Sequence, residues 1–264
     1  MICFIFFFIH TFSYEENASC VILPNGEPKI TMTIDTNADA WAYWNNSIFE
    51  IGWYKLHIEG REGSDPYNML RCAGLLEGYL SQHEIYLHYQ LIKDIHNFKR
   101  DEPYSENWKY FMEKNMNYTF HSIEAYVDSP YWQDINYTIT QFNGLVDGYK
   151  LRQEERGYTN ETMTPLDFWF LEAECELYDI ESALSQKRQK VNGPTNGEDC
   201  TGLIRLLPDY SDIFFSQDTW SDFRDLHGEL KEYHFPIPQF KANRVIFSTR
   251  VGKLFSYDDF YIAD

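Results

Sequence analysis

The sequence predicts an α+β protein, because two regions with the pattern of β-strands flank a long region of helical periodicity. The first β-like region runs from residue 28 to 58, helical spacing follows for about 120 residues, and the β pattern returns beyond residue 200. The chain has 264 residues, 44% of them hydrophobic and 18% aromatic, so it can bury a sizeable core. This composition excludes a disordered chain.

Two strands are expected in the first β-like region. Residues 29–34 and 49–54 carry β-branched and aromatic side chains with partial alternation between apolar and polar positions. The segment 60–66, GREGSDP, is typical of a loop because it is polar and contains glycine and proline. We therefore expect the N-terminal strands to end before residue 60.

Apolar residues then recur every three or four positions, which predicts a series of helices. One helix is expected to open at Ser81, because Ser81 and Glu84 have the spacing of a capping box. Thr164 followed by Pro165 predicts another start, with Thr164 as the cap and Pro165 at the first helical position. The expected helical stretches are 67–74, 81–95, 108–123, 132–149 and 166–184.

The last part of the chain opens with a linker. Residues 186–197 are polar, basic in their first half and rich in glycine, proline and asparagine, which predicts an exposed segment that is readily cut. A short helix is expected from a cap at Thr219 through Leu230 to Tyr233. The expected strands in this part are 203–207, 213–216, 244–249 and 254–262.

The N-terminus predicts export through the secretory pathway. Residues 1–13, MICFIFFFIHTFS, form an apolar run that is too short to span a bilayer, and we interpret them as a signal peptide. No other stretch reaches 18 apolar residues, so no transmembrane anchor is expected. Sequons of the form N-x-S/T predict glycosylation at Asn17, Asn45, Asn117, Asn136 and Asn160.

Charge and motif spacing exclude several classes of partner. The formal net charge of −19 argues strongly against a nucleic-acid-binding protein, because phosphate contacts need Lys and Arg. It also disfavours an electrostatic attraction to anionic membranes. His83 and His88 in HEIYLH lie about 140° apart round a helix, whereas zinc chelation needs histidines four residues apart on one face. We therefore expect neither a metal nor another cofactor.

Cysteine use leaves several alternatives open. Removal of the signal peptide leaves Cys20, Cys72, Cys175 and Cys200, which allow three full disulfide pairings. Cys200 stands where the polar linker gives way to an apolar strand. A cut between Asp199 and Cys200 would make Cys200 an N-terminal nucleophile whose own α-amine, with a pKa of about 7.7–8.0, accepts the thiol proton. The alternatives are a disulfide or a small buried side chain.

Sequence words spread along most of the chain resemble those of the phospholipase B-like family, also called lamina-ancestor-like proteins. Each word is short, and their order and spacing together carry the resemblance. The words are 73–81 (AGLLEGYLS), 130–132 (PYW), 143–149 (NGLVDGY), 179–184 (DIESAL), Cys200 with 203–208 (LIRLLP), 219–220 (TW), 245–248 (VIFS) and 258–262 (DDFYI).

The resemblance implies an N-terminal-nucleophile hydrolase with an αββα sandwich, activated by self-cleavage ahead of Cys200. Family members are secreted or lysosomal and are assigned hydrolysis of acyl bonds, nominally fatty-acyl esters of phospholipids, with amides also considered. The implied organisation is a signal peptide (1–13), a largely helical part (14–185), a cleavable linker (186–199) and the start of the sheet core (200–264). The family continues for roughly as long again beyond Asp264, so we expect an incomplete sandwich completed by a missing half or a second chain.

The implied pocket departs from the family pattern at one position. Gln217 stands where the family has a histidine, and glutamine donates a hydrogen bond to an oxyanion but does not titrate near neutral pH. Thr219 and Trp220 match and are expected to line the pocket, with core packing as the alternative for Trp220. Three functions therefore stay open, namely an ester hydrolase, an amidase, and a non-catalytic secreted protein that binds lipid or glycan.

Overall fold

The protein contains a mixed β-sheet whose strands come from both ends of the chain. The computed structural model describes residues 13–96, 106–184, 200–218, 223–258 and 260–264. The strand order of the seven-stranded sheet is β2-β1-β3-β4-β7-β8-β9. Neighbouring strands are antiparallel except for β4 and β7, which are parallel. The strands are β1 (Tyr14–Ile22), β2 (Pro28–Thr31), β3 (Ala40–Ser47), β4 (Trp53–Gly60), β7 (Gly228–His234), β8 (Arg244–Arg250) and β9 (Ile262–Ala263).

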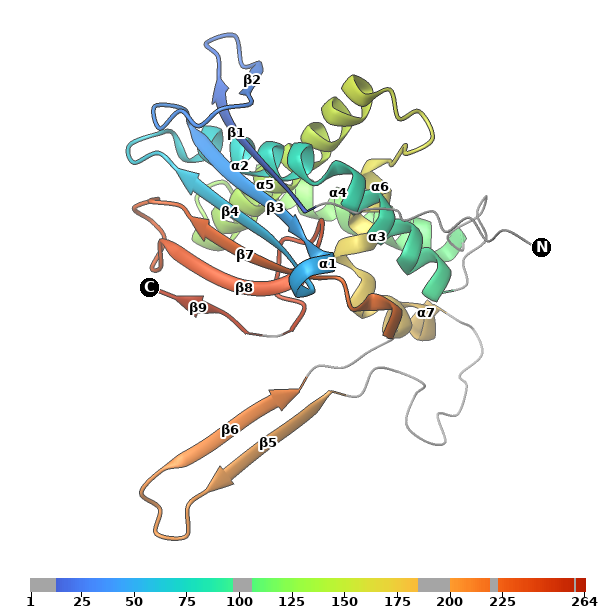
Figure 1. The fold of residues 1–264 in the computed structure, drawn as a ribbon. Coiled ribbons are helices and arrows are strands. Elements are labelled where there is room, and N and C mark those ends of the chain that lie inside the picture. Colours follow the sequence, from blue (N-terminus) through green and yellow to red (C-terminus); the bar gives the residue numbers. More distant parts are fainter. Residues whose placement is uncertain (1–12, 97–105, 185–199, 219–222, 259) are drawn as a thin grey trace, which may run out of the picture.

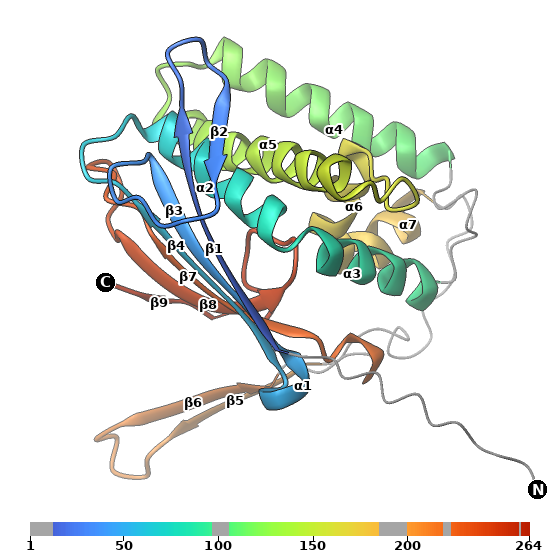
Figure 2. The same cartoon turned by 45° about the horizontal axis from the view of Figure 1, so that its top comes forward.

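Helices cover one face of this sheet (Figures 1 and 2). The shared core joins sheet residues such as Trp44, Leu56 and Phe247 to helix residues such as Leu75 and Leu145, all at most 2% exposed. This combination of helices with a mixed sheet confirms the expected α+β class. The helices are α1 (Ile48–Ile51), α2 (Pro66–Leu80), α3 (Gln82–Ile95), α4 (Glu106–Ala125), α5 (Pro130–Arg156), α6 (Pro165–Glu172) and α7 (Leu177–Leu184), with 3-10 turns at Glu174–Glu176 and Phe223–Asp225.

Two glycine pairs set the contact between α2 and α5. A Cβ added to Gly74 or Gly78 would lie 1.8 or 2.0 Å from the main-chain oxygen of Gln141 or Leu145 on α5. Gly144 and Gly148 face α2 in the same way, at 2.2 and 2.0 Å from the oxygens of Arg71 and Leu75. The glycines of the words AGLLEGYLS and NGLVDGY therefore allow the two helix backbones to touch, as small residues four apart do in other helix pairs.

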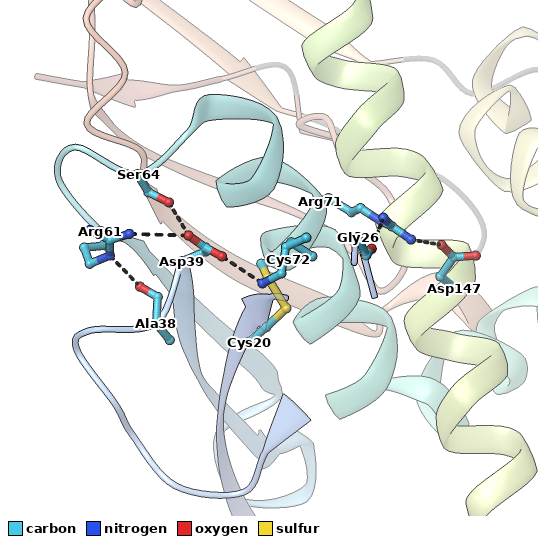
Figure 3. The surroundings of a disulfide bond; sticks show 10 residues. Cys20, Gly26, Ala38, Asp39, Arg61, Ser64, Arg71, Cys72 and Asp147 are labelled. Atoms are coloured by element: carbon cyan, nitrogen blue, oxygen red, sulfur yellow. Dashed lines mark hydrogen bonds and ion pairs between the residues drawn. A yellow bond between two sulfur atoms is a disulfide. The ribbon is translucent and has the colours of Figure 1, made fainter. Parts of the chain in front are cut away.

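A disulfide joins β1 to α2 and resolves the pairing that the sequence left open. Cys20 and Cys72 are both fully buried and their sulfurs are bonded, with the Cα atoms 5.4 Å apart. Figure 3 shows Asp39 beside the bond, where its carboxylate accepts hydrogen bonds from the Ile22 N–H at 2.8 Å and from the Ser64 hydroxyl. A disulfide indicates folding in an oxidising compartment.

The N-terminal ends of two helices test the capping predictions. Thr164 caps α6 as expected, because its side chain accepts from the Asp167 N–H and Pro165 occupies the first turn. The capping box at Ser81 was wrong, since the Ser81 hydroxyl instead donates to the Glu77 carbonyl at 2.6 Å. That bond is made because α2 ends where α3 begins, so the last turn of α2 supplies the acceptor.

Three other local predictions were also wrong. Of the strand expected over 49–54, only Trp53 and Tyr54 are in a strand, the start of β4, while residues 49–51 belong to α1, which ends at Gly52 with its left-handed φ of 79°. The segment around Leu230 and Tyr233 is β7 rather than a helix, since its burial alternates and it pairs with two strands. Of the strand expected over 254–262, the described residues form only β9, which overlaps that range at Ile262.

Candidate active site on the hairpin and a buried charge network

Cys200 stands at the base of a separate hairpin. It is exposed and precedes β5 (Thr201–Leu206), which pairs in antiparallel fashion with β6 (Ile213–Asp218). Gln217 lies opposite Gly202, so the structure brings Cys200 and Gln217 to the same end of the hairpin. Asp199, Thr219 and Trp220 lie outside the described residues. Within the described chain Cys200 is neither in a disulfide nor buried, so the two alternative roles for this thiol are not found.

Both faces of the hairpin are apolar and exposed. The cross-strand pair Ile204 and Phe215 is 75% and 83% exposed, and Leu203 and Phe214 are 58% and 56% exposed. Figure 2 shows the hairpin on the side of the main sheet that faces away from α2 and α5. Unpaired edges and apolar faces of this size are normally covered by another segment or chain.

The sequons lie on several elements of the fold. Asn17, Asn117 and Asn160 are exposed, as glycan acceptors must be. Asn45 and Asn136 are half-buried, and their side-chain amides donate to Glu15 at 2.6 Å and to the Tyr67 hydroxyl at 3.3 Å. Glycosylation at these two positions would have to break the hydrogen bonds that the amide nitrogens make.

A buried charge network that was not predicted from the sequence lies between the helices and the sheet. The fully buried Lys231 on β7 donates to Glu77 of α2 at 2.5 Å and to the Lys253 carbonyl at 2.6 Å. Glu229 lies 3.2 Å from the same ammonium group, and the Tyr233 hydroxyl donates to Glu77 at 2.6 Å. Burial alone would lower the pKa of Lys231, but Glu229 and Glu77 together raise it. The ammonium group is therefore held in its charged form.

The network continues to the end of α6. Lys253 is fully buried, donates to the Leu171 carbonyl at 2.6 Å and lies 2.8 Å from Glu174. Glu172 accepts from the Leu254 N–H at 3.0 Å, and burial raises the pKa of this carboxyl to about 7 although Lys253 opposes the shift. These contacts fix the turn after β8 against the helical layer.

A third buried set joins α3 to the same turn. His88 is hydrogen-bonded through Nδ1 to the Val251 carbonyl at 2.8 Å, and burial lowers its pKa to about 4. The Arg250 guanidinium contacts Asp225 at 3.1 Å, while burial raises the pKa of Asp225 to about 6. These contacts link α3 to the turn after β8, and the hairpin that carries Cys200 lies on the other side of the sheet (Figure 2).

One signal in the sequence pointed to this network. Glu229, Lys231 and Tyr233 alternate with a period of two, which is typical of one face of a strand. This stretch was predicted as part of a helix, and a helix does not place residues two apart on one face, so the three side chains were not recognised as neighbours. Glu77 also stands inside the apolar word AGLLEGYL, where an unpaired carboxylate would be costly.

The structure shows neither a metal site nor a membrane span in the part that it describes. Among the described residues no group of three His, Cys, Asp or Glu side chains converges as metal ligands. No helix in the described ranges is long and apolar enough to cross a membrane.

The chain belongs to the phospholipase B family, because the family model described as Phospholipase B matches residues 40–264. This confirms the resemblance seen in the sequence words. The chain is 32% identical over 239 residues to the human protein named Putative phospholipase B-like 2, covering 86% of this chain and 40% of the relative. It is 32% identical over 250 residues to Phospholipase-B 81 of Drysdalia coronoides (87% and 43%), and 27% identical over 249 residues to Phospholipase B-like protein C of Dictyostelium discoideum (91% and 43%). The chain thus spans about two fifths of the length of these relatives.

Proposed function

We propose that this protein is a phospholipase B-like acyl hydrolase of the secretory pathway, secreted or lysosomal, with Cys200 as an N-terminal nucleophile. The observation that carries the proposal is the exposed Cys200 at the start of an apolar hairpin, in a chain of this family. The disulfide between Cys20 and Cys72 supports the secretory route. The αββα sandwich and the participation of Thr219 and Trp220 in the pocket belong to the same proposal.

Activation is proposed to begin with attack of the Cys200 thiol on the carbonyl carbon of Asp199. The peptide nitrogen leaves with a proton as the new α-amine, and water hydrolyses the thioester, which frees both the Asp199 carboxyl group and the Cys200 thiol. The α-amine then serves as the general base for Cys200.

Catalysis follows the same chemistry on an external acyl group. The α-amine takes the thiol proton, sulfur attacks the acyl carbonyl, and the tetrahedral oxyanion collapses with release of the alcohol, which receives the proton. Water then hydrolyses the thioester to a free fatty acid. Gln217, at the same end of the hairpin, is proposed to donate to the oxyanion because a glutamine amide donates hydrogen bonds but does not move protons near pH 7.

N-terminal sequencing and intact mass of the protein secreted from its complete reading frame test the activation step. We expect a new chain that begins at Cys200, and we expect Cys200→Ala to abolish both the cut and acyl release. Cys175→Ala, which changes the other free cysteine in the described part of the chain, is the matched control and should retain both. A wild-type protein that stays uncut, together with unchanged activity in Cys200→Ala, would refute the proposal.

A second candidate is a non-catalytic protein that binds lipid or glycan, which Gln217 favours because the family pattern has a histidine there. Gln217→His separates the two. A catalytic protein should gain acyl release in this variant, whereas a binding protein should show no release from any substrate. Parallel assays on matched ester and amide substrates decide between an esterase and an amidase.

A further inference from the structure

A cavity of about 750 Å³ opens at the end of the sheet where α1 joins β3 to β4. Its size falls within the range of roughly 300–1,000 Å³ that is typical of small-molecule sites. Figure 1 shows that α1, the start of β1 and α3 meet at this end of the sheet. The cavity has aromatic walls formed by Tyr14, Phe49, Tyr54 and Tyr158.

Glu84 of α3 lines this cavity as a buried carboxylate without a basic partner. It is 5% exposed, and its Oε1 accepts from the Tyr14 hydroxyl at 2.6 Å and from the Asn46 amide at 2.9 Å. Its buried Oε2 has no hydrogen-bond partner, and among the described residues no Lys, Arg or His forms an ion pair with Glu84. Buried carboxylates are normally paired with a cation, so Glu84 lacks the positively charged partner that such a group usually has.

The other charged groups around the cavity do not supply a positively charged partner for Glu84. Arg156 lies 3.7 Å from Glu16, and His83 lies 2.9 Å from Glu161, so both rim bases already face carboxylates. Glu15 adds a further carboxylate to the lining, whereas Glu16 already faces both Arg152, at 2.9 Å, and Arg156. Burial lowers the pKa of His227, which favours the neutral ring. The cavity therefore attracts cations.

We propose that this cavity binds a small organic ammonium ion. Glu84 supplies the countercharge, and the tyrosine and phenylalanine rings supply cation–π contacts, which are strongest when the cation is desolvated. A divalent metal ion fits less well, because none of the four aromatic side chains is an anionic ligand at neutral pH and such ions need several oxygen ligands. This site does not depend on any role of Cys200. Two kinds of molecule carry such an ammonium group, a free amine and a phospholipid with an ammonium headgroup.

Calorimetric titration of the full chain carrying Cys200→Ala, with choline as the probe, tests the proposal. The control ligand is 3,3-dimethylbutan-1-ol, which has the shape of choline but no charge. We expect choline to bind at least about tenfold more tightly than the alcohol, and Glu84→Gln to remove most of that preference. Glu27→Gln, an exposed acid outside the cavity, should leave binding unchanged.

Phe49→Ala provides a variant that does not endanger the fold, since Phe49 is 75% exposed on α1. We expect it to weaken choline binding several-fold while leaving the thermal midpoint unchanged. Equal affinity for choline and the alcohol, or choline binding that neither variant weakens, would overturn the proposal, as would the absence of saturable choline binding in the millimolar range.

A second experiment, with phosphatidylcholine vesicles, distinguishes the two sources of the ammonium group. Vesicle binding that choline competes away assigns the site to a lipid headgroup, and choline binding without vesicle binding assigns it to a free amine.

Discussion

Replacing Gly148 by alanine tests whether the contact between α2 and α5 determines stability. The added Cβ would lie 2.0 Å from the Leu75 carbonyl oxygen and 2.8 Å from its carbon, both main-chain atoms that no rotamer change can move. Helix propensity alone predicts the opposite effect, because alanine stabilises a helix interior by about 1 kcal/mol relative to glycine. The sign of the change therefore distinguishes local preference from packing.

The magnitude follows from the separation that the helices must adopt. Bringing the new Cβ from 2.0 Å to an ordinary contact of 3.4 Å moves the two backbones about 1.4 Å apart. Overpacking of a core typically costs about 1–3 kcal/mol, and a clash with rigid backbone belongs at the upper end of that range or beyond. A loss of about 3 kcal/mol corresponds to a decrease in thermal midpoint of about 6–12 °C.

Thermal unfolding followed by circular dichroism measures this effect. Gly202→Ala is the matched control, because a Cβ at Gly202 has nothing within 4 Å and its midpoint should barely move. A Gly148→Ala protein as stable as the wild type would mean that the backbones of α2 and α5 are not in close contact at Gly148.

Three further predictions concern the disulfide and the buried charges. The double variant Cys20→Ser, Cys72→Ser should lose about 4 kcal/mol in urea unfolding, because it releases a loop of 52 residues in the unfolded chain. An unfolding midpoint of the wild type that does not change when reductant is added would contradict the predicted loss. Lys231→Met should lose about 3–5 kcal/mol because Glu77 is left buried without its cation, and adding Glu77→Gln should recover much of that loss; no recovery would argue against the pair. Glu172, whose pKa is raised from 4.5 to about 7, binds its proton more tightly in the folded state, so its contribution to stability falls as pH rises from about 4.5 to 7. Glu172→Gln should therefore flatten this part of the pH profile of unfolding, and an unchanged slope would refute the assignment.

The helices could be predicted from sequence because their signals are local. Apolar spacing placed α2 to α5, and the Thr164–Pro165 pair gave the start of α6. The same reasoning failed at β7, where Leu230 and Tyr233 fit a helical spacing by chance. Pairing with β4 and β8 decides that segment, and neither partner is visible within the window of a periodicity argument.

The candidate site, too, could be predicted from the sequence only in part. The change from linker to apolar strand and the family words singled out Cys200 and Gln217, and the register of β5 and β6 places both at one end of the hairpin. The buried network could not be predicted, because Lys231 and Glu77 lie 154 positions apart. Glu84 was expected to act in a cap, and only the packing of α3 against β1 shows it as a buried acid facing a cavity.

Composition, local periodicity and short sequence words were enough to predict the α+β class, most helices and the family. The folded structure was needed to show which cysteines pair, that β4 joins β7 across 175 positions, and which charges share the core. The physical reason is that strand pairing, disulfides and buried ion pairs depend on distances in space, and the chain sets those distances only when the whole core has packed.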